Sequence, residues 1–499
     1  MSTGRNVVNF SEGPSRRRIA GVEGRVHHPP GLDWISPLAE VNEMITTARE
    51  ALFVGRLDQD RFGDLLMPHV LGRLLHLSRV RCGGLVNVDF SAIGGHSVRN
   101  YGECALEMRS PGLKLVHVGG DVLDLDLVDG YREAAEGEEA ERFESLAGIS
   151  GREELYRYVR RRSGQLSDFA YLLEPTGEFW GAGLSFHAVG LPDPGRLSPE
   201  RRERLLGNLR RAQFVGVRDE AGANFLAREG IAVERMPCAL SVLPQVCARQ
   251  LRECRDRDSL ESIRHRFPDG WITVETSGVR AADAERLVTA LREVSEREHL
   301  GLVFFEANRT RGGAPRSLRS WVEAFPEWQA AEFGSRNLWE IASLLLHSRL
   351  YCGTCLAART LCMSGGVARI QIPAGDAATL GYCELWEHDE VPIEFAADEN
   401  WSDALGEALS VDWTILQHHA TWLHERYRQS FDRFCRDTGI EPRLVPGVAV
   451  ETEHDRAANG RAANGRASNG RVAPGFREGW GKRPTSPRGG AWRTGAATA

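Results

Sequence analysis

An acidic residue at a strand-to-helix turn is the first group in this sequence that could do chemistry. The motif R-F-G-D at 61–64 stands between an apolar run at 51–55 and an amphipathic stretch at 65–76. Glycine lets a backbone approach a ligand closely, and open α/β sheets bind ligands at the carboxyl ends of their strands. The motif therefore predicts that Gly63 and Asp64 contact a substrate, although an aspartate in this place is also a common helix N-cap.

A second candidate is the segment 94–103, which contains His96 and Arg99 and follows the apolar run 85–90. Its glycine and polar residues are dense enough to predict a loop that receives an anion. The spacing fits neither the dinucleotide fingerprint G-x-G-x-x-G nor the Walker A motif, so neither type of nucleotide site is predicted. An ordinary tight turn is the alternative interpretation.

A glycine pair gives the third candidate. Gly119, Gly120 and Asp121 follow the apolar run 114–118, again at the carboxyl end of a predicted strand. Such a pair allows a ligand to lie directly on the backbone. We therefore expect these three residues to bind substrate, with a tight turn as the alternative.

Arg218 is the cation best placed for binding a substrate. The predicted strand 214–217 runs into it directly, and a predicted helix follows. A guanidinium at a strand end offers a planar fork of donors to a carboxylate or a phosphate. The neighbouring Asp219 would cap the helix or orient that guanidinium, and a surface ion pair is the alternative for Arg218.

The fifth candidate is a strand, a glycine turn and a helix within 349–359, where Gly353 and Thr354 form the turn. A helix N-terminus carries unpaired N–H groups and partial positive charge, which suits an anionic donor. Cys352 and Cys355 also form a C-x-x-C pair, but the positions of the other cysteines do not match a zinc ribbon. We expect small buried cysteines here and no metal.

The elements that must position these residues alternate along the chain, which is typical of βα units and a parallel sheet. The predicted strands are continuous apolar runs at 51–55, 85–90, 114–118, 169–173, 183–189, 214–217, 271–275, 300–306, 349–353 and 368–372. The predicted helices are the amphipathic stretches at 65–76, 199–211, 220–228, 282–298, 337–346, 357–364 and 412–436.

The expected fold class is α/β, with two facing Rossmann-like domains and a C-terminal helix that crosses both. One sheet of ten strands would be unusually large, and a proline- and glycine-rich stretch at 190–199 separates two groups of units. The predicted organisation is a disordered arm at 1–35, domains at 36–197 and 198–398, a helical segment at 399–440, and a disordered basic tail at 445–499 that contains RAANG repeats.

Composition narrows the class of protein without selecting a partner. The chain has 499 residues, of which 42% are hydrophobic and 26% charged, and its net charge is −7. These values suit a globular protein and do not favour nucleic-acid binding. We see no apolar run long enough to span a membrane and no signal peptide, so we expect a cytoplasmic protein with reduced cysteines.

The order of the motifs resembles the polysaccharide pyruvyl transferase family. The matching motifs, in chain order, are F-G-D-L-L-M-P-H at 62–69, the glycine pair at 119–120, V-R-D with a following helix and G-I at 217–231, and N-L-W-E-I-A followed by G-T-x-L-A at 353–357. The resemblance covers roughly residues 51–393. It rests on the agreement in order and spacing of motifs that are each short.

This resemblance implies a GT-B-like fold with the active site in the cleft between the domains. It also implies transfer of the pyruvyl group of phosphoenolpyruvate to two hydroxyls of a glycan or glycolipid sugar, with no other cofactor. Arg218 and the helix N-terminus at Thr354 would then hold the anionic donor, and Asp64 would help to handle the proton of the acceptor hydroxyl. Asp64 and Arg218 are thus the expected catalytic residues.

Several positions depart from the family pattern. The family's late R-x-H motif is replaced, with Cys355 at the arginine position and Ala357 at the histidine position, and Cys238 stands where an aspartate usually follows a proline. Arg359, one turn into the helix, is the expected substitute for the lost cation, with His347 and Arg349 as alternatives. Two other functions stay open: a GT-B-type glycosyltransferase that uses a nucleotide sugar, and a catalytically degenerate member that binds a glycan or a protein.

Overall fold

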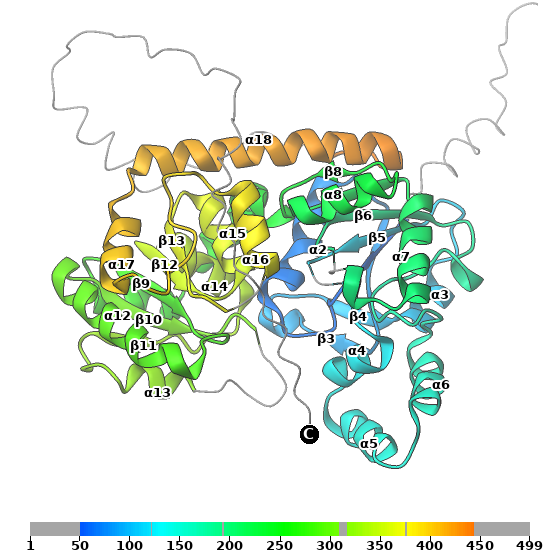
Figure 1. Ribbon diagram of the computed structural model, residues 1–499, viewed down its shortest axis with the longest axis horizontal. Coiled ribbons are helices and arrows are strands. Elements are labelled where there is room, and N and C mark those ends of the chain that lie inside the picture. Colours follow the sequence, from blue (N-terminus) through cyan, green and yellow to red (C-terminus); the bar gives the residue numbers. More distant parts are fainter. Residues whose placement is uncertain (1–49, 121, 192–193, 309–316, 375–376, 444–499) are drawn as a thin grey trace, which may run out of the picture. The chain divides into compact units, whose positions relative to one another are not determined.

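The computed structural model describes residues 50–120, 122–191, 194–308, 317–374 and 377–443, which all lie in one unit, Met1–Val448. The predicted disordered arm and basic tail lie outside the described residues, and so does Asp121. The described part is built on two separate sheets (Figure 1).

The first sheet has eight strands in the order β3-β4-β2-β1-β5-β6-β7-β8. All neighbours pair in parallel except β3 and β4, and the central strands are apolar runs buried almost throughout. Burial on both faces explains why these strands read as continuous apolar segments. The strands are β1 (Glu50–Val54), β2 (Arg79–Gly84), β3 (Val88–Asp89), β4 (Ser97–Asn100), β5 (Lys114–Val118), β6 (Gly183–Val189), β7 (Phe214–Val217) and β8 (Glu234–Arg235).

Helices accompany the strands of this sheet, and polar side chains fix where several of them begin. Asn100, Ser198 and Asp219 each accept a hydrogen bond from a backbone N–H in the first turn of the helix that follows. The helices are α2 (Phe62–Leu74), α3 (Tyr101–Glu107), α4 (Leu127–Ala134), α5 (Gly137–Ala147), α6 (Arg152–Ser163), α7 (Pro199–Arg211) and α8 (Glu220–Arg228).

The second sheet is fully parallel and has the order β11-β10-β9-β12-β13. Its strands are β9 (Trp271–Glu275), β10 (Gly301–Phe305), β11 (Ala330–Glu332), β12 (Leu350–Gly353) and β13 (Ala368–Gln371). The helices that precede, alternate with or follow its strands are α9 (Leu243–Val246), α10 (Ala248–Arg255), α11 (Asp258–Arg266), α12 (Ala284–Glu298), α13 (Leu318–Val322), α14 (Leu338–Leu346), α15 (Leu356–Gly365), α16 (Ala377–Trp386) and α17 (Trp401–Ser410).

The long helix α18 (Trp413–Thr438) contacts both domains, as predicted. It begins at the N-cap Asp412 and packs on α15 of the second domain and on β6 and β7 of the first (Figure 1). Its buried side, which includes Leu423 and Phe434, belongs to the core that the two domains share. The predicted fold class, two Rossmann-like α/β domains of the GT-B type with a crossing helix, is confirmed.

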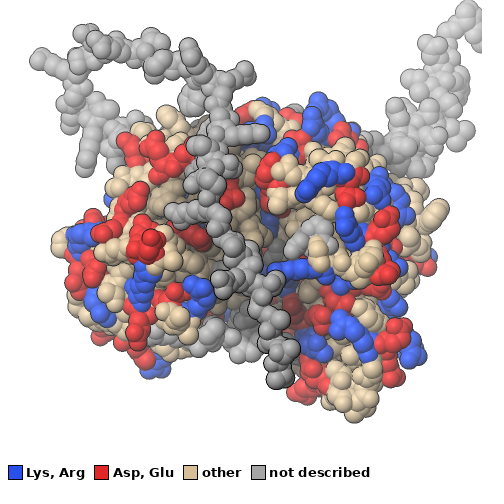
Figure 2. All heavy atoms as spheres, in the orientation of Figure 1, with Lys and Arg blue, Asp and Glu red and all other residues tan. Residues whose placement is uncertain are grey.

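Charged side chains of both signs mix on the surface. On the face shown in Figure 2, lysine and arginine residues alternate with aspartate and glutamate over both domains, and among the described residues of this face neither sign dominates. Among the described residues, no helix is both long enough and apolar enough to cross a bilayer.

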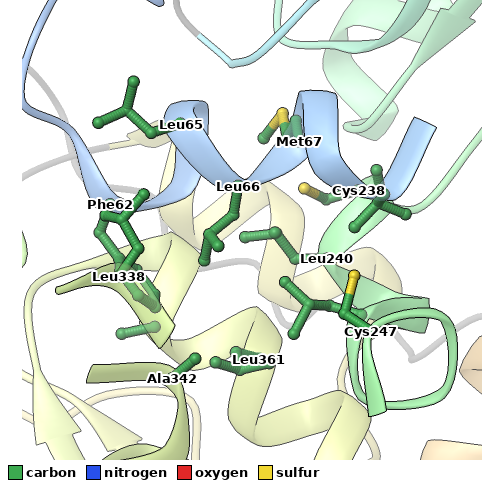
Figure 3. Close-up of a cluster of buried hydrophobic side chains, with 14 of the residues drawn as sticks. Phe62, Leu65, Leu66, Met67, Cys238, Leu240, Cys247, Leu338, Ala342 and Leu361 are labelled. Carbon is green, nitrogen blue, oxygen red and sulfur yellow. The ribbon is translucent and has the colours of Figure 1, made fainter. Parts of the chain in front are cut away.

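A hydrophobic cluster joins the first helix to the second domain. Phe62 and Leu66 of α2 pack with Leu240 of the 3₁₀ turn Ala239–Val242, and with Leu338 of α14 and Leu361 of α15 (Figure 3). These side chains are between 0% and 1% exposed. Burial of apolar side chains from both domains therefore holds the first turns of α2 in place against the second domain.

The predicted domain boundary between residues 197 and 198 falls inside the first sheet. β7 pairs in parallel with β6, and β8 pairs with β7, so this sheet continues to Arg235. The predicted separation of two groups of units at 190–199 is therefore wrong, because β6 and β7, which lie on either side of this stretch and α7, belong to one sheet. The composition of the stretch does not indicate which sheet the next strand joins.

Three segments of the first domain differ from the predicted elements. The run 85–90 contains only the short edge strand β3, and the run 169–173 forms no strand but a single bridge between Phe169 and Asp126. The expected loop 94–103 instead contains β4 and the start of α3. In these segments pairing with neighbouring strands decided the structure, and local composition did not reveal it.

A buried carboxyl after β1 makes the stability of the first domain depend on pH. Asp58 is 2% exposed and accepts hydrogen bonds from Leu85 N–H (2.6 Å) and the Tyr171 hydroxyl (2.7 Å). Burial raises the pKa of Asp58 from 3.8 to about 6. The folded protein therefore holds this proton more tightly than the unfolded chain, and the contribution to stability is full below pH 4 and lost as the pH rises through about 6.

We expect Asp58→Asn to abolish this loss of stability at rising pH, which amounts to about 3 kcal/mol for a pKa shift of this size. Urea unfolding of both proteins between pH 4 and pH 7.5 measures it, with the exposed Asp398→Asn as the matched control. Parallel pH profiles for wild type and Asp58→Asn would contradict the expectation.

Candidate active site

A cavity of about 140 Å³ lies where residues from the carboxyl ends of both sheets meet. The start of α2, the glycine pair after β5 and Arg218 after β7 contribute from the first domain, and the β12–α15 turn contributes from the second. This is the edge at which open α/β sheets bind ligands. The lining residues are Arg61, Gly63, Asp64, Met67, Gly120, Arg218, Cys238, Asn308, Thr354, Cys355, Leu356, Ala357, Thr360 and Thr379.

Asp64 lies in the first turn of α2 and faces the glycine pair. The helix begins at Phe62 with Arg61 as its N-cap residue, so the alternative interpretation of Asp64 as the cap is wrong. Arg61 Nε donates to Asp64 Oδ2 at 3.0 Å. A Cβ placed on Gly119, whose φ is +102°, would lie 2.9 Å from Asp64 Oδ1. Gly119 thus has both the backbone conformation and the close contact that require glycine.

The Arg218 guanidinium lies directly on Gly120. A Cβ placed on Gly120 would lie 2.1 Å from Arg218 Nη1, so only glycine fits there with this arginine conformation. The backbone of Arg218 is held on both sides, because its N–H donates to Val189 O (3.0 Å) and its carbonyl accepts from Trp386 Nε1 (2.8 Å). Arg218 is 8% exposed, so its side chain is buried at the site and does not lie on the open surface.

Asp219, the residue after Arg218, acts as the helix cap. Its Oδ1 accepts a hydrogen bond of 2.6 Å from Gly222 N–H in the first turn of α8. Of the two roles predicted for Asp219, the structure shows the cap. This contact fixes the end of β7 and hence the point from which Arg218 extends.

Thr354 lines the cavity, but its donors are already occupied. Its N–H and its hydroxyl both donate to Glu275 Oε2, at 3.0 Å and 2.7 Å. Glu275 ends β9, is fully buried, and also accepts from Ser277 N–H. The α15 helix begins only at Leu356, after the N-cap Cys355. A carboxylate therefore occupies the donors that were predicted to hold an anion, and this part of the prediction is corrected.

Two small side chains occupy the positions of the family's R-x-H motif. Cys355 and Ala357 both line the cavity, and the Ala357 methyl lies so close to Gly63 that a Cβ there would be 2.4 Å away. Burial raises the pKa of the Cys355 thiol to about 12, and it also raises the pKa of Cys238, to about 11. Both thiols are therefore protonated at neutral pH and are poor nucleophiles.

Arg359, the expected substitute cation, lies away from the cavity. It is fully buried and donates to Glu387 Oε2 at 2.8 Å and to the carbonyl of Ile393. Arg369 binds the same carboxylate, and His419 accepts from Arg369 Nη2. The prediction that Arg359 binds substrate is wrong, because an interior carboxylate neutralises it. His347 and Arg349 do not line the cavity either.

Two further predicted residues, His96 and Arg99, line a different cavity, formed by α2, β2 and β4. Gly353 is buried at the end of β12, where a Cβ would lie 2.5 Å from the Tyr351 hydroxyl, so it supports the turn without lining the cavity. The structure thus brings together Gly63, Asp64 and Gly120 with Arg218 and Thr354, and Gly119 lies against Asp64. It places His96, Arg99 and Arg359 elsewhere.

Chemically, the cavity combines a carboxylate and a guanidinium in a mostly polar wall. The guanidinium can bind a phosphate or carboxylate, while Asp64 can accept a proton from a hydroxyl group. No group of three or more metal-ligating side chains occurs among the described residues. The sequence analysis did not predict a role for Glu275 or Trp386. Glu275 could have been identified as an acidic residue at the end of the apolar run 271–275.

Comparisons with known proteins found no matching family model and no matching curated protein. Among solved structures, UDP-GlcNAc 2-epimerase from Methanocaldococcus jannaschii is similar with a TM-score of 0.42 and 11% identity, over 73% of this chain and 93% of that chain. A putative UDP-N-acetylglucosamine 2-epimerase from Listeria monocytogenes gives 0.43 and 11%, over 75% and 90%.

A UDP-forming α,α-trehalose-phosphate synthase from Burkholderia vietnamiensis gives a TM-score of 0.34 and 10% identity, over 52% of this chain and 66% of that chain. At these TM-scores and sequence identities, structural similarity does not indicate a shared activity. The strand order and the cavity themselves define the class: a two-domain α/β protein of the GT-B type, with its candidate site at the carboxyl ends of both sheets.

Proposed function

We propose that this protein is an enzyme that acts on sugars and takes a small, phosphate-bearing donor into the cavity between its two sheets. The observation that carries the proposal is the convergence of Asp64, Gly120 and Arg218 on one polar cavity. These residues come from three different strand-to-helix turns that are far apart in the sequence. A guanidinium seated on a glycine beside a carboxylate suits an anionic donor and a hydroxyl acceptor.

Phosphoenolpyruvate is the donor that we propose first. The resemblance to pyruvyl transferases implies it, and the size of the cavity supports it. A volume of about 140 Å³ is well below the roughly 300–1,000 Å³ of pockets that enclose drug-sized ligands. In this reaction two acceptor hydroxyls form a ketal at C2 of the donor; one hydroxyl proton ends on C3, which becomes a methyl group, and the other leaves with the inorganic phosphate. Arg218 would bind the phosphate or the carboxylate, and Asp64 would take a hydroxyl proton.

A nucleotide-sugar glycosyltransferase is the second candidate. Two Rossmann-like domains with a site between them are also the architecture of GT-B glycosyltransferases, and a fold does not select among chemistries. Arg218 would then bind the diphosphate of the nucleotide. This candidate requires space for the nucleoside beyond the cavity described above.

The experiment is a thermal unfolding series on the full chain with phosphoenolpyruvate, UDP and GDP. A ligand at about one hundred times its Kd adds about 2.7 kcal/mol of stability, which is readily measured. We expect phosphoenolpyruvate to stabilise the wild type and to lose that effect in Arg218→Ala. The matched control is Arg109→Ala, because the Arg109 side chain is 61% exposed and lies outside the cavity.

The pattern of responses separates the candidates. Stabilisation by UDP or GDP alone, lost in Arg218→Ala, favours the glycosyltransferase. A flat response to all three ligands contradicts an anionic donor in this cavity and favours a protein that keeps the fold without the transfer reaction. Each variant is compared with and without ligand, so a change in its basal stability does not affect the result.

A further inference from the structure

A second cavity, of about 520 Å³, is lined by α2, β2 and β4 and has more basic than acidic lining residues. It shares no lining residue with the candidate active site. Arg73 of α2, Arg81 of β2 and Arg99 of β4 line it, together with His69 and His96. Its only acidic lining residue among those described is Glu107, which pairs with Arg81 at 3.0 Å, and Arg99 lies 3.7 Å from Glu103 outside the lining.

The two histidines form a tightly packed wall. Their ring centroids are 3.8 Å apart, and His69 Nε2 donates to the Gly94 carbonyl at 2.9 Å. Burial and the neighbouring Arg73 lower the pKa of His96 to about 4, so the ring is neutral at pH 7. Its Nε2 atom has no hydrogen-bond partner among the described residues. A buried ring nitrogen without a hydrogen-bond partner is uncommon in folded proteins.

Trp339 of the second domain packs against this pair of histidines. Trp339 of α14 donates its indole N–H to the Gly94 carbonyl at 3.1 Å, and its ring meets His69 edge-on at 4.9 Å. Arg73 lies 5.9 Å from the centre of the same ring and donates to the His69 carbonyl at 2.9 Å. The cavity is therefore held in place by contacts between the domains.

We infer that this cavity binds a small ligand carrying negatively charged oxygens, of the size of a phosphorylated or carboxylated monosaccharide. A planar guanidinium can donate to two oxygens of a carboxylate or of a phosphate, and the volume falls within the range of cavities that enclose small ligands. The inference is independent of the donor proposed for the active site, since no residue belongs to both cavities. A phosphate ester and a uronic acid share the required chemistry.

Ser97 offers the sharpest test, because it lines the cavity, is exposed, and has no charge of its own. Ser97→Glu places a carboxylate among the arginines, while Ser97→Gln adds the same bulk without charge. We expect calorimetric titration of the full chain to detect binding of glucose 1-phosphate, inorganic phosphate or glucuronate. Binding should be at least about tenfold weaker in Ser97→Glu than in Ser97→Gln, because the two side chains have the same bulk and differ in charge.

The three probes identify the source of the anion. Binding of glucose 1-phosphate indicates a phosphate ester, binding of inorganic phosphate alone indicates free phosphate, and binding of glucuronate indicates an acidic sugar; each supports the inference. Equal affinities in Ser97→Glu and Ser97→Gln, or no binding by any probe, would overturn it. Loss of binding in Arg218→Ala would also overturn it, because the ligand would then occupy the active-site cavity.

Discussion

Replacing Glu387 with glutamine is expected to lower the free energy of unfolding by about 3–5 kcal/mol. Its carboxylate accepts from Arg359 at 2.8 Å and from Arg369 at 2.6 Å, and all three side chains are at most 1% exposed. Although burial alone raises the pKa of Glu387, the guanidiniums of Arg369 and Arg359 hold it well below its usual range. Without that charge, two buried cations have no neutralising partner.

Urea unfolding at pH 7 measures the effect. Glu384→Gln is the matched control, since Glu384 is exposed on α16, three residues before Glu387. A change of less than about 1 kcal/mol for Glu387→Gln would contradict the prediction and would mean that the interior carries the two cations without a counter-charge.

Gly120→Ala is expected to destroy the proposed donor site while the protein still folds. The added methyl would meet the Arg218 guanidinium, so the guanidinium must move or the sheet must shift, at a cost of about 1–3 kcal/mol. We expect the variant to lose the ligand-induced rise in melting temperature, even though Arg218 itself is unchanged. Thermal unfolding with and without phosphoenolpyruvate, UDP and GDP measures this loss.

The control for Gly120→Ala is Gly72→Ala in α2. No atom lies within 4 Å of the position where that methyl would go, and alanine favours a helix over glycine by about 1 kcal/mol. Gly72→Ala should therefore keep the ligand response and stabilise the protein slightly. If Gly120→Ala responds to ligand as the wild type does, Arg218 does not need its present position to bind the donor.

The sequence predicted strands most accurately where both faces of a sheet are buried, because such strands are continuous apolar runs. The predicted ranges of β5, β6, β7 and β9 agree with the structure to the residue, because each is a bounded apolar run. The same logic placed Asp64, Gly120 and Arg218 at strand ends. Since parallel strands end on one edge of a sheet, the sequence predicts that these residues lie on the same edge.

Interactions between distant segments could not be read from local sequence. Arg359 looked like a substrate-binding cation because nothing near it in the chain reveals that Glu387 and Arg369 enclose it. Thr354 looked like an anion-binding turn because Glu275, 79 positions away in the chain, is the group that occupies its donors. In both cases tertiary packing brings a buried charged side chain to its partner, and such packing leaves no periodic pattern in the sequence.

The shared core around α2 has a consequence for how the protein moves. Domains joined by a small polar interface usually rotate against each other, whereas a large apolar interface opposes such rotation. Here Phe62 and Leu66, two residues from Asp64 on either side, pack against α14 and α15 of the second domain. A hinge that opened the cleft would have to expose this cluster to water. We therefore expect the proposed donor-binding groups to keep their positions relative to the second domain when a ligand enters.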